Sequence, residues 1–353
     1  MEAKAADVEA KVAAVLAEGE TVDAELAKAM GTAASVGDPG AQLVKDWKQG
    51  GDGKDGPSID GKARVNGPAE QTHDDLGATI PGTGIRLGGD GVSEPGKPGS
   101  NYPRIHVPAH DGIPEFDGPN PLPVRRDANG NPLERPLPTG TAVGPDGKRY
   151  GFYSIVPYNN PDGTPNGSYS TNDTVVVDLD HPNQVLYTLH GVSQASGVFD
   201  PNSGRMVIVG NQGVGGPRTM WESAPVNQNS AWGNTLQQQG TFSGAMNGNR
   251  ESQIVALPNN GGYMLVGAAD GRPIEGAVAS TPEGLLTAVP KELLGPIPDS
   301  SGKIGVPYGP TITGFSTDSH GHVVVDMRVS TFTNPKPLPY NPETYDTTFT
   351  VTP

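Results

Sequence analysis

The chain has 353 residues, of which 34% are apolar, 50 are glycine and 36 are proline, so a large part of it cannot be packed core. Acidic residues outnumber basic residues by 39 to 24, and the net charge of −15 argues against a nucleic-acid partner, since phosphate binding needs a positive field. Cysteine is absent, which excludes disulfides, thiol catalysis and cysteine-ligated zinc. We expect one folded domain of roughly 200 residues.

Residues 1–31 are predicted to form two short helices. Apolar side chains recur at helical spacing on both sides of Gly19, Thr21 is a suitable N-cap for the second helix, and Gly31 ends it. Both apolar stripes are narrow and rich in alanine, so we expect these helices to dock on another helical unit. The segment has no basic region followed by an apolar stretch, so export would use a route other than an ordinary signal peptide. The sequence contains no run of about 18 apolar residues, so no membrane-spanning helix is predicted.

Residues 32–140 are rich in glycine and proline and contain few aromatic residues, which predicts a long linker. The exception is the stretch 102–124, where apolar residues are more frequent. We expect that stretch to lie partly on the surface of the domain that follows.

Residues 141–353 contain short runs of Val, Ile, Tyr and Thr bounded by turn residues, which is typical of antiparallel strands. A glycine opens an apolar run at Gly147, Gly204, Gly262 and Gly321, with spacings of 57, 58 and 59 residues. Each unit has room for three or four strands, as in a propeller blade. The predicted fold is therefore an all-β, β-propeller-like domain of four to five blades, with a β-sandwich as the alternative.

Two segments resemble known families. The stretch Glu20–Met30 resembles the last helices of WXG-type bundles, and the chain as a whole is similar to conserved hypothetical proteins of the mycobacterial type VII secretion-associated group. The segment Gly276–Leu285 fits the outer Ala-x-Ser strand in the five-bladed propellers of arabinanase-like glycoside hydrolases, and Met220–Ala224 fits it loosely. The second resemblance implies a glycan substrate and catalytic carboxylates near the starts of the innermost strands.

Glu251 is the candidate catalytic acid, because it heads the apolar run of a predicted inner strand. Glycoside cleavage needs a second carboxylate, for which Asp326 and Glu222 are the candidates. The alternative is that Arg250 and Glu251 form a structural ion pair in the central channel.

Aromatic faces stack on sugars and side-chain amides bind hydroxyls, which defines a second group of candidates. These substrate-binding candidates are Arg250, Gln253, Gln194, Trp221, Trp232 and Tyr308, with Tyr263 as a further aromatic platform. For the aromatic members the alternative is ordinary packing between blades.

Histidines are too sparse for a recognisable metal motif. Neither His106 with His110 and Asp111, nor His320 with His322, supplies three ligands at a defined spacing, so we expect no metal and no cofactor. The repeat and the resemblances together predict a secreted or cell-envelope protein that binds a cell-wall carbohydrate. Cleavage of that carbohydrate is the further expectation. The alternative function is a non-catalytic protein-interaction module associated with type VII secretion.

Overall fold

The computed structural model describes residues 56–67, 70–71, 77–80, 86–88, 105–107, 116–118, 121–122, 125–130, 133–157, 159, 171–181, 184–226, 231–298, 302–332 and 343–352. These residues belong to one compact unit, Gly56–Pro353. The two helices predicted for residues 1–31 lie outside the described residues. No helix in the described part of the chain has the length and apolar character needed to cross a bilayer.

The unit is built from antiparallel sheets, four of which have four strands each and one of which has six. The four-stranded sheets are β3 (Gly77–Thr79), β4 (Arg86–Gly88), β5 (Ile105–Val107) and β6 (Phe116–Gly118); β7 (Glu134–Val143), β8 (Arg149–Pro157), β9 (Thr174–Asp178) and β10 (Val185–Leu189); β11 (Val192–Asp200), β12 (Arg205–Gln212), β13 (Arg218–Glu222) and β14 (Gln237–Thr241); and β15 (Ser252–Ala256), β16 (Tyr263–Gly267), β17 (Ile274–Ala279) and β18 (Lys291–Leu294). The six-stranded sheet contains β19 (Ile297–Pro298), β20 (Ile304–Thr317), β21 (Val323–Phe332), β22 (Glu343–Thr352), β1 (Ser58–Val65) and β2 (Glu70–Gln71). Four short 3-10 helices lie between described strands: η1 (Trp232–Thr235), η2 (Gly244–Met246), η3 (Pro258–Asn260) and η4 (Glu283–Leu286).

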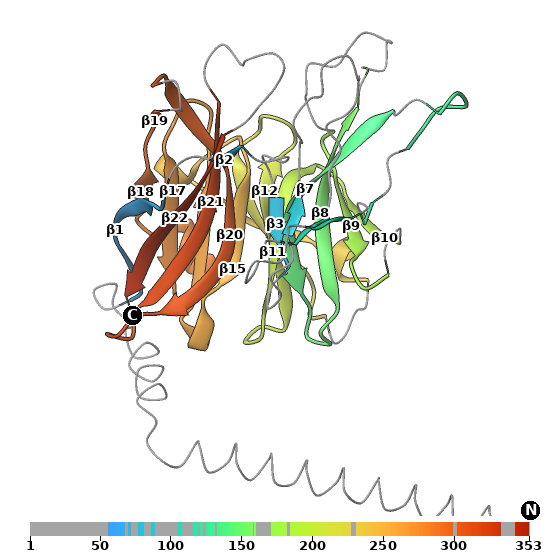
Figure 1. Ribbon diagram of the computed structural model, residues 1–353. Coiled ribbons are helices and arrows are strands. Elements are labelled where there is room, and N and C mark those ends of the chain that lie inside the picture. The colour runs from blue at the N-terminus through green and yellow to red at the C-terminus, as the bar shows by residue number, and fades with distance from the viewer. Residues whose placement is uncertain are drawn as a thin grey trace, which may run out of the picture. The chain divides into compact units, whose positions relative to one another are not determined.

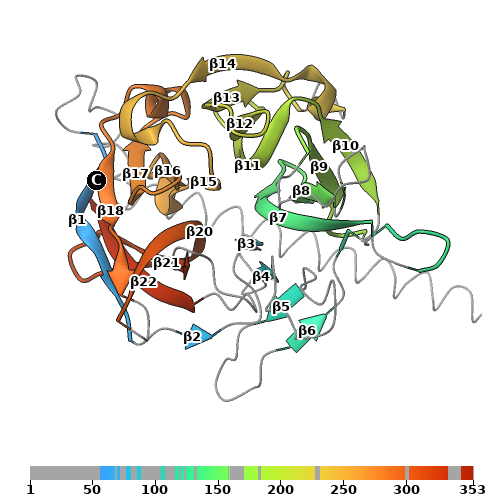
Figure 2. The ribbon, with the colours of Figure 1, turned by 90° about the horizontal axis from the view of Figure 1, so that it is seen from above.

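The sheets are arranged radially rather than face to face. Figure 1 shows the strands from the side, and Figure 2 shows β3, β7, β11, β15 and β20 around a common centre with their sister strands further out. Successive inner strands contact one another around this centre. The prediction of an all-β, propeller-like fold is thus confirmed, and the β-sandwich alternative is wrong.

The four repeated glycines mark equivalent hairpins. Gly147, Gly204, Gly262 and Gly321 all have positive φ, at 77°, 70°, 88° and 85°. Each lies in the turn between the inner strand and the second strand of its sheet. Only glycine takes this conformation without strain, which is why the sequence carries the repeat at these positions.

The same period appears in hydrogen bonds between neighbouring inner strands. The Ile254 amide donates to Ser196 Oγ at 3.1 Å, 58 residues away, and the Ile312 amide donates to Gln253 Oε1 at 2.9 Å, 59 residues away. A second contact in each pair lies earlier on both partners, because Gln194 bonds Glu251 and the Arg250 guanidinium lies over the Tyr308 ring. Strands β11, β15 and β20 therefore run in the same direction. The inner strands therefore share an amino end, where they begin, and a carboxyl end, where they finish.

The β unit starts well before the boundary at Thr141 expected from composition. Strand β1 pairs with the last strand, β22, with Ser58 opposite Thr352. Strands β3–β6 form a complete sheet inside the range predicted as linker, and β7 begins at Glu134. Strand β1 lies at a sheet edge and β3–β6 have three residues each, so these strands need little apolar sequence, and composition does not reveal them.

Candidate functional site

Glu251 lies immediately before the inner strand β15, at the amino end, and is only 6% exposed. Both carboxylate oxygens accept hydrogen bonds. Oε1 accepts from Gln194 Nε2 at 3.0 Å, and Oε2 accepts from Arg250 Nε at 3.3 Å. Three of the candidates named from the sequence therefore lie together in one contact cluster.

Arg250 connects this buried carboxylate to an exposed one. Its Nη1 lies 3.4 Å from Asp270 Oδ1, and its guanidinium carbon lies 5.4 Å from the centre of the Tyr308 ring. The charge of Glu251, with a smaller contribution from Asp270, holds the pKa of Arg250 above its usual value. Since the Asp270 side chain is 64% exposed, this chain of contacts leads from the interior to solvent. We call Gln194, Arg250, Glu251, Asp270 and Tyr308 the amino-end cluster.

Gln194 is fixed by its own neighbours. Its backbone has a positive φ of 50°, unusual for a residue other than glycine. The Gln194 backbone amide donates to Ser154 Oγ at 3.0 Å, and the side-chain Oε1 accepts from Asn211 Nδ2 at 2.7 Å. Because Oε1 is already used by Asn211, the amide group Nε2 is turned toward Glu251.

A fully buried arginine lies behind the cluster. Arg218 Nη1 donates to the Met246 carbonyl at 2.7 Å, and Nη2 donates to the carbonyls of Ala268 at 2.7 Å and Arg250 at 3.3 Å. Burial, followed by repulsion from Arg272, lowers the pKa of Arg218 to about 10, and the charge of Glu251 opposes this shift. Besides its contact with Arg250, Glu251 thus interacts electrostatically with a second, fully buried guanidinium.

Gln253 lies on β15, two residues after Glu251, and bridges three inner strands. Its Nε2 donates to the Gly77 carbonyl at 2.9 Å, and its Oε1 accepts from the Ile312 amide at 2.9 Å. Thr311 Oγ1 also donates to the Gly77 carbonyl, at 3.1 Å. Since both ends of the Gln253 amide are used inside the protein, its contacts are structural ones.

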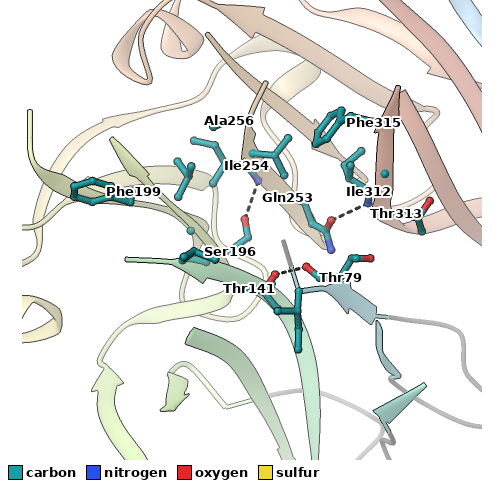
Figure 3. A pocket seen from close by; sticks show the side chains of 18 of the residues that line it. Thr79, Thr141, Ser196, Phe199, Gln253, Ile254, Ala256, Ile312, Thr313 and Phe315 are labelled. Atoms are coloured by element: carbon teal, nitrogen blue, oxygen red, sulfur yellow. Dashed lines mark hydrogen bonds between the residues drawn. The ribbon is translucent and has the colours of Figure 1, made fainter. Parts of the chain in front are cut away.

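A cavity of about 760 Å³ opens at the carboxyl end of the inner strands. Figure 3 shows its walls, which come from the later residues of the five inner strands, β3, β7, β11, β15 and β20, and are mostly apolar. The larger side chains in them are Phe199, Ile254, Ile312 and Phe315. Glu251 is not among the lining residues. The amino-end cluster and this cavity, which we call the carboxyl-end pocket, therefore lie on opposite sides of the Gln253 bridge.

The predicted aromatic platforms are part of the core. Trp232 is fully buried, with ring centroids 5.4 Å from Tyr150 and 5.0 Å from Tyr187, and Trp221 is 8% exposed in the same cluster. Tyr263 is buried as well. Packing between strands and sheets, the alternative for these residues, fits the structure better than sugar stacking because their faces are already covered.

The two predicted partner carboxylates, Glu222 and Asp326, are not on the inner strands themselves, although Asp326 lies opposite Gly314 of the inner strand β20. Glu222 is on β13 and Asp326 is on β21. Burial, and then the nearby Glu283, raise the pKa of Glu222 to about 7. Burial and Asp346 raise the pKa of Asp326. The carboxylate that does share a guanidinium with Glu251 is Asp270.

Sequence reasoning missed Asp270 because it lies in a turn rather than at a strand start. It follows β16, which runs antiparallel to β15, with Ser252 opposite Gly267. The turn after β16 therefore returns to the amino end. An Asp-Gly pair two residues beyond the second strand of the unit was the available signal.

Comparison with known proteins finds similarity among solved structures. No family model matches the chain, and no curated protein is detectably similar to it in sequence. Among solved structures, an exo-β-1,3-galactanase from Clostridium thermocellum is similar with a TM-score of 0.48 and 12% identity, over 80% of this chain and 61% of that one. An endo-1,4-β-xylanase from Bacteroides thetaiotaomicron gives 0.42 and 12%, over 80% and 92% of the two chains.

A third similar structure is an α-L-arabinanase from Penicillium chrysogenum, complexed with arabinobiose, with a TM-score of 0.39 and 12% identity, over 81% of this chain and 98% of that one. These structural neighbours are thus glycoside hydrolases. Similarity to the mycobacterial secretion group remains a prediction. What this chain does depends on the chemistry of its own residues.

Proposed function

We propose that the chain binds a carbohydrate at the amino end of its inner strands. The observation that carries the proposal is that the Arg250 guanidinium joins the buried Glu251 to the exposed Asp270. The contact between Arg250 and Asp270 places a donor, the guanidinium, beside an acceptor, the carboxylate, at the protein surface. Neighbouring sugar hydroxyls need such a pair, because each hydroxyl both donates and accepts.

A third polar group completes the surface. Asn249 Nδ2 donates to Asp270 Oδ2 at 2.9 Å, and the Asp270 amide donates to Asn249 Oδ1 at 3.2 Å. The reciprocal bonds order Asp270 before any ligand arrives. Ordering in advance lowers the entropic cost of binding a flexible, hydrated ligand.

The contacts of Glu251 favour binding over cleavage. Cleavage needs two carboxylates that face one glycosidic bond. Both oxygens of Glu251 are engaged by Gln194 and Arg250. A positioning role for Glu251, through Arg250, fits these contacts better than a catalytic one.

The test is calorimetric titration of the whole chain with arabinan, xylan and galactan oligosaccharides. We expect saturable binding that falls at least tenfold in Asp270→Asn and in Arg250→Gln. Asp60→Asn, a change of an exposed aspartate on β1, is the matched control and should bind as the unchanged chain does. Failure of every oligosaccharide to bind would refute the proposal. Release of reducing ends that is lost in Glu251→Gln would instead make the chain a hydrolase.

The alternative, a protein-interaction module of type VII secretion, depends on residues 1–31, which lie outside the described residues. It remains a prediction, as does a location in the cell envelope or outside the cell. Fractionation of cells that express the whole chain tests the location directly.

A further inference from the structure

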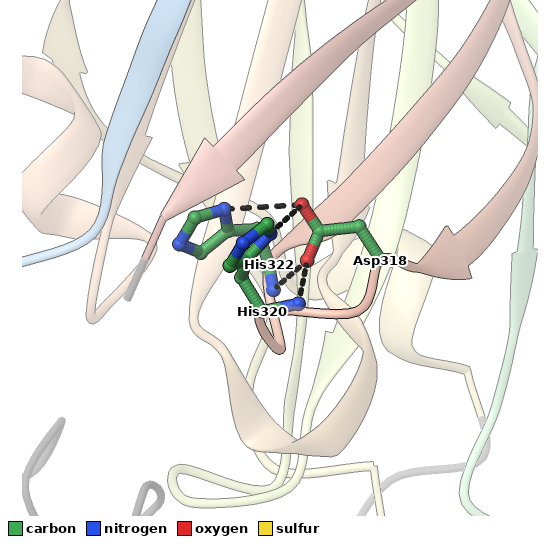
Figure 4. A group of neighbouring side chains, drawn as sticks. All are labelled: Asp318, His320 and His322. Carbon is green, nitrogen blue, oxygen red and sulfur yellow. Dashed lines mark hydrogen bonds and ion pairs between the residues drawn. The ribbon is translucent and has the colours of Figure 1, made fainter.

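The hairpin between β20 and β21 gathers three side chains with metal-binding atoms. Asp318, His320 and His322 come from five consecutive residues, and their donor atoms all lie within 4.8 Å of one another. Figure 4 shows both imidazole rings facing the same carboxylate. The expectation of no metal counted only the two histidines and so found too few ligands.

The backbone of this turn holds the group in place. Asp318 Oδ1 accepts the amides of His320 at 2.8 Å and His322 at 2.9 Å. The Asp318 amide donates to the His322 carbonyl at 3.0 Å, and Gly321 takes a positive φ of 85°. Since Oδ1 is used by the backbone, Oδ2 is the oxygen that faces the rings.

The ring nitrogens converge on that oxygen. Asp318 Oδ2 lies 3.2 Å from His322 Nδ1 and 3.8 Å from His320 Nδ1. The two rings are nearly parallel, with an interplanar angle of 22° and centroids 5.7 Å apart. The His320 side chain is 76% exposed, so small rotations can bring its nitrogen closer.

We propose that Asp318, His320 and His322 form a binding site for a divalent transition-metal ion, with Zn²⁺ as the probe. Two imidazole nitrogens and one carboxylate oxygen are ligands that Zn²⁺ and its neighbours in the first transition row accept at about 2.0–2.2 Å. Three protein ligands leave a coordination position open to solvent or to a fourth donor. A hard cation such as Ca²⁺ needs more oxygen ligands than this turn offers.

The chain contains a matched control for a plain His–Asp contact. His190 Nδ1 lies 3.0 Å from Asp173 Oδ2, and Asp173 Oδ1 also accepts a backbone amide, from Gly191 at 2.9 Å. This pair repeats the carboxylate–imidazole and carboxylate–amide contacts with a single histidine, although its two residues are 17 positions apart. If the proposal is right, it contributes nothing to metal affinity.

The experiment is calorimetric titration of the metal-free whole chain with Zn²⁺ at pH 7.5, repeated with Co²⁺ to record its visible absorption. We expect one Zn²⁺ per chain, at least tenfold weaker affinity in His322→Ala and in Asp318→Asn, and no change in His190→Ala. Asn at position 318 retains an oxygen for the turn amides but loses the anionic ligand, so circular dichroism should show an unchanged fold.

Three results would overturn the proposal. One is the absence of saturable Zn²⁺ binding to the unchanged chain. Another is equal affinity in the unchanged chain and the His320→Ala/His322→Ala double variant, which would place the ion elsewhere. Competition by Ca²⁺ at similar concentration would likewise contradict a nitrogen-containing site.

Discussion

The two ends of the inner strands differ in chemistry although the same strands build both. At the amino end, charged and amide side chains such as Glu251, Arg250 and Gln194 form hydrogen bonds with one another. At the carboxyl end the walls of a 760 Å³ pocket are mostly apolar. Between them Gln253 ties neighbouring strands together. The backbone repeat therefore fixes where a site can lie, and the residues at each strand end decide what it can bind.

Among substitutions at the two ends, Arg218→Leu, behind the amino-end cluster, should lower the free energy of unfolding most. The change leaves the carbonyls of Met246, Ala268 and Arg250 without their donor and removes a positive charge behind Glu251. We expect a loss of about 3 kcal/mol or more in the free energy of unfolding. Urea denaturation checks this, with the exposed Arg64→Leu as the control, for which the change should stay within about 0.5 kcal/mol. Equal stability of the two variants would contradict a structural role for Arg218.

Glu251→Gln should have the next largest effect. An amide keeps one acceptor oxygen but removes the charge that faces Arg250, so we expect a loss of about 1–2 kcal/mol, discounted because Arg250 is partly exposed. The control is Glu292→Gln, which removes an exposed carboxylate that pairs with Lys62. A larger effect at Glu292 would show that the amino-end cluster is not a stabilising unit.

Glu222 is a buried carboxylate whose environment is opposite to that of Glu251, because its neighbour is the carboxylate of Glu283. Its pKa rises from 4.5 to about 7 in the folded chain, so the folded state holds a proton that the unfolded state has lost. The contribution to stability is therefore full below pH 4.5 and is lost as the pH rises through 7. Glu222→Gln should flatten this part of the stability curve, with a gain of about 1 kcal/mol at pH 8. Thermal unfolding between pH 4.5 and 8 measures this change in stability. A curve unchanged by the substitution would count against a raised pKa at Glu222.

The smallest effect on stability should come from Ala256→Trp, at the exposed wall of the carboxyl-end pocket. We expect less than about 0.5 kcal/mol, since the added ring enters open space. An apolar fluorescent dye should bind the unchanged chain and bind less well to this variant. Val289→Trp, at a position 87% exposed, is the control and should leave dye binding unchanged. Dye binding that survives Ala256→Trp would show that the apolar site lies elsewhere.

The parts of the fold that depend on local backbone chemistry could be predicted from the sequence. Gly147, Gly204, Gly262 and Gly321 stand where the chain needs a positive φ, so their regular spacing makes the repeat visible in the sequence itself. Strand β1 was missed because an edge strand that pairs over a long sequence distance has no such local requirement.

The amino-end cluster was predictable in part for a similar reason. Glu251 and Gln194 lie 57 residues apart, close to the repeat, so both fall at the starts of equivalent strands. Asp270 and Asp318 lie in turns, where a carboxylate has many structural uses and its spatial neighbours depend on the returning chain. Trp221 and Trp232 could not be assigned by type alone, because the same aromatic residue serves a sugar site or a core.

The pairing of β1 with β22 has a consequence for how the molecule assembles. Ser58 Oγ and Thr352 Oγ1, 294 residues apart, lie 2.9 Å from each other. During synthesis, the sheets from β7 to β18 can form as each is made, whereas the last sheet must wait for its final strand while the segment around Ser58 stays unpaired. The ring then closes in a single late step, and a chain shortened past Val65 would expose the edge of β22 to other molecules.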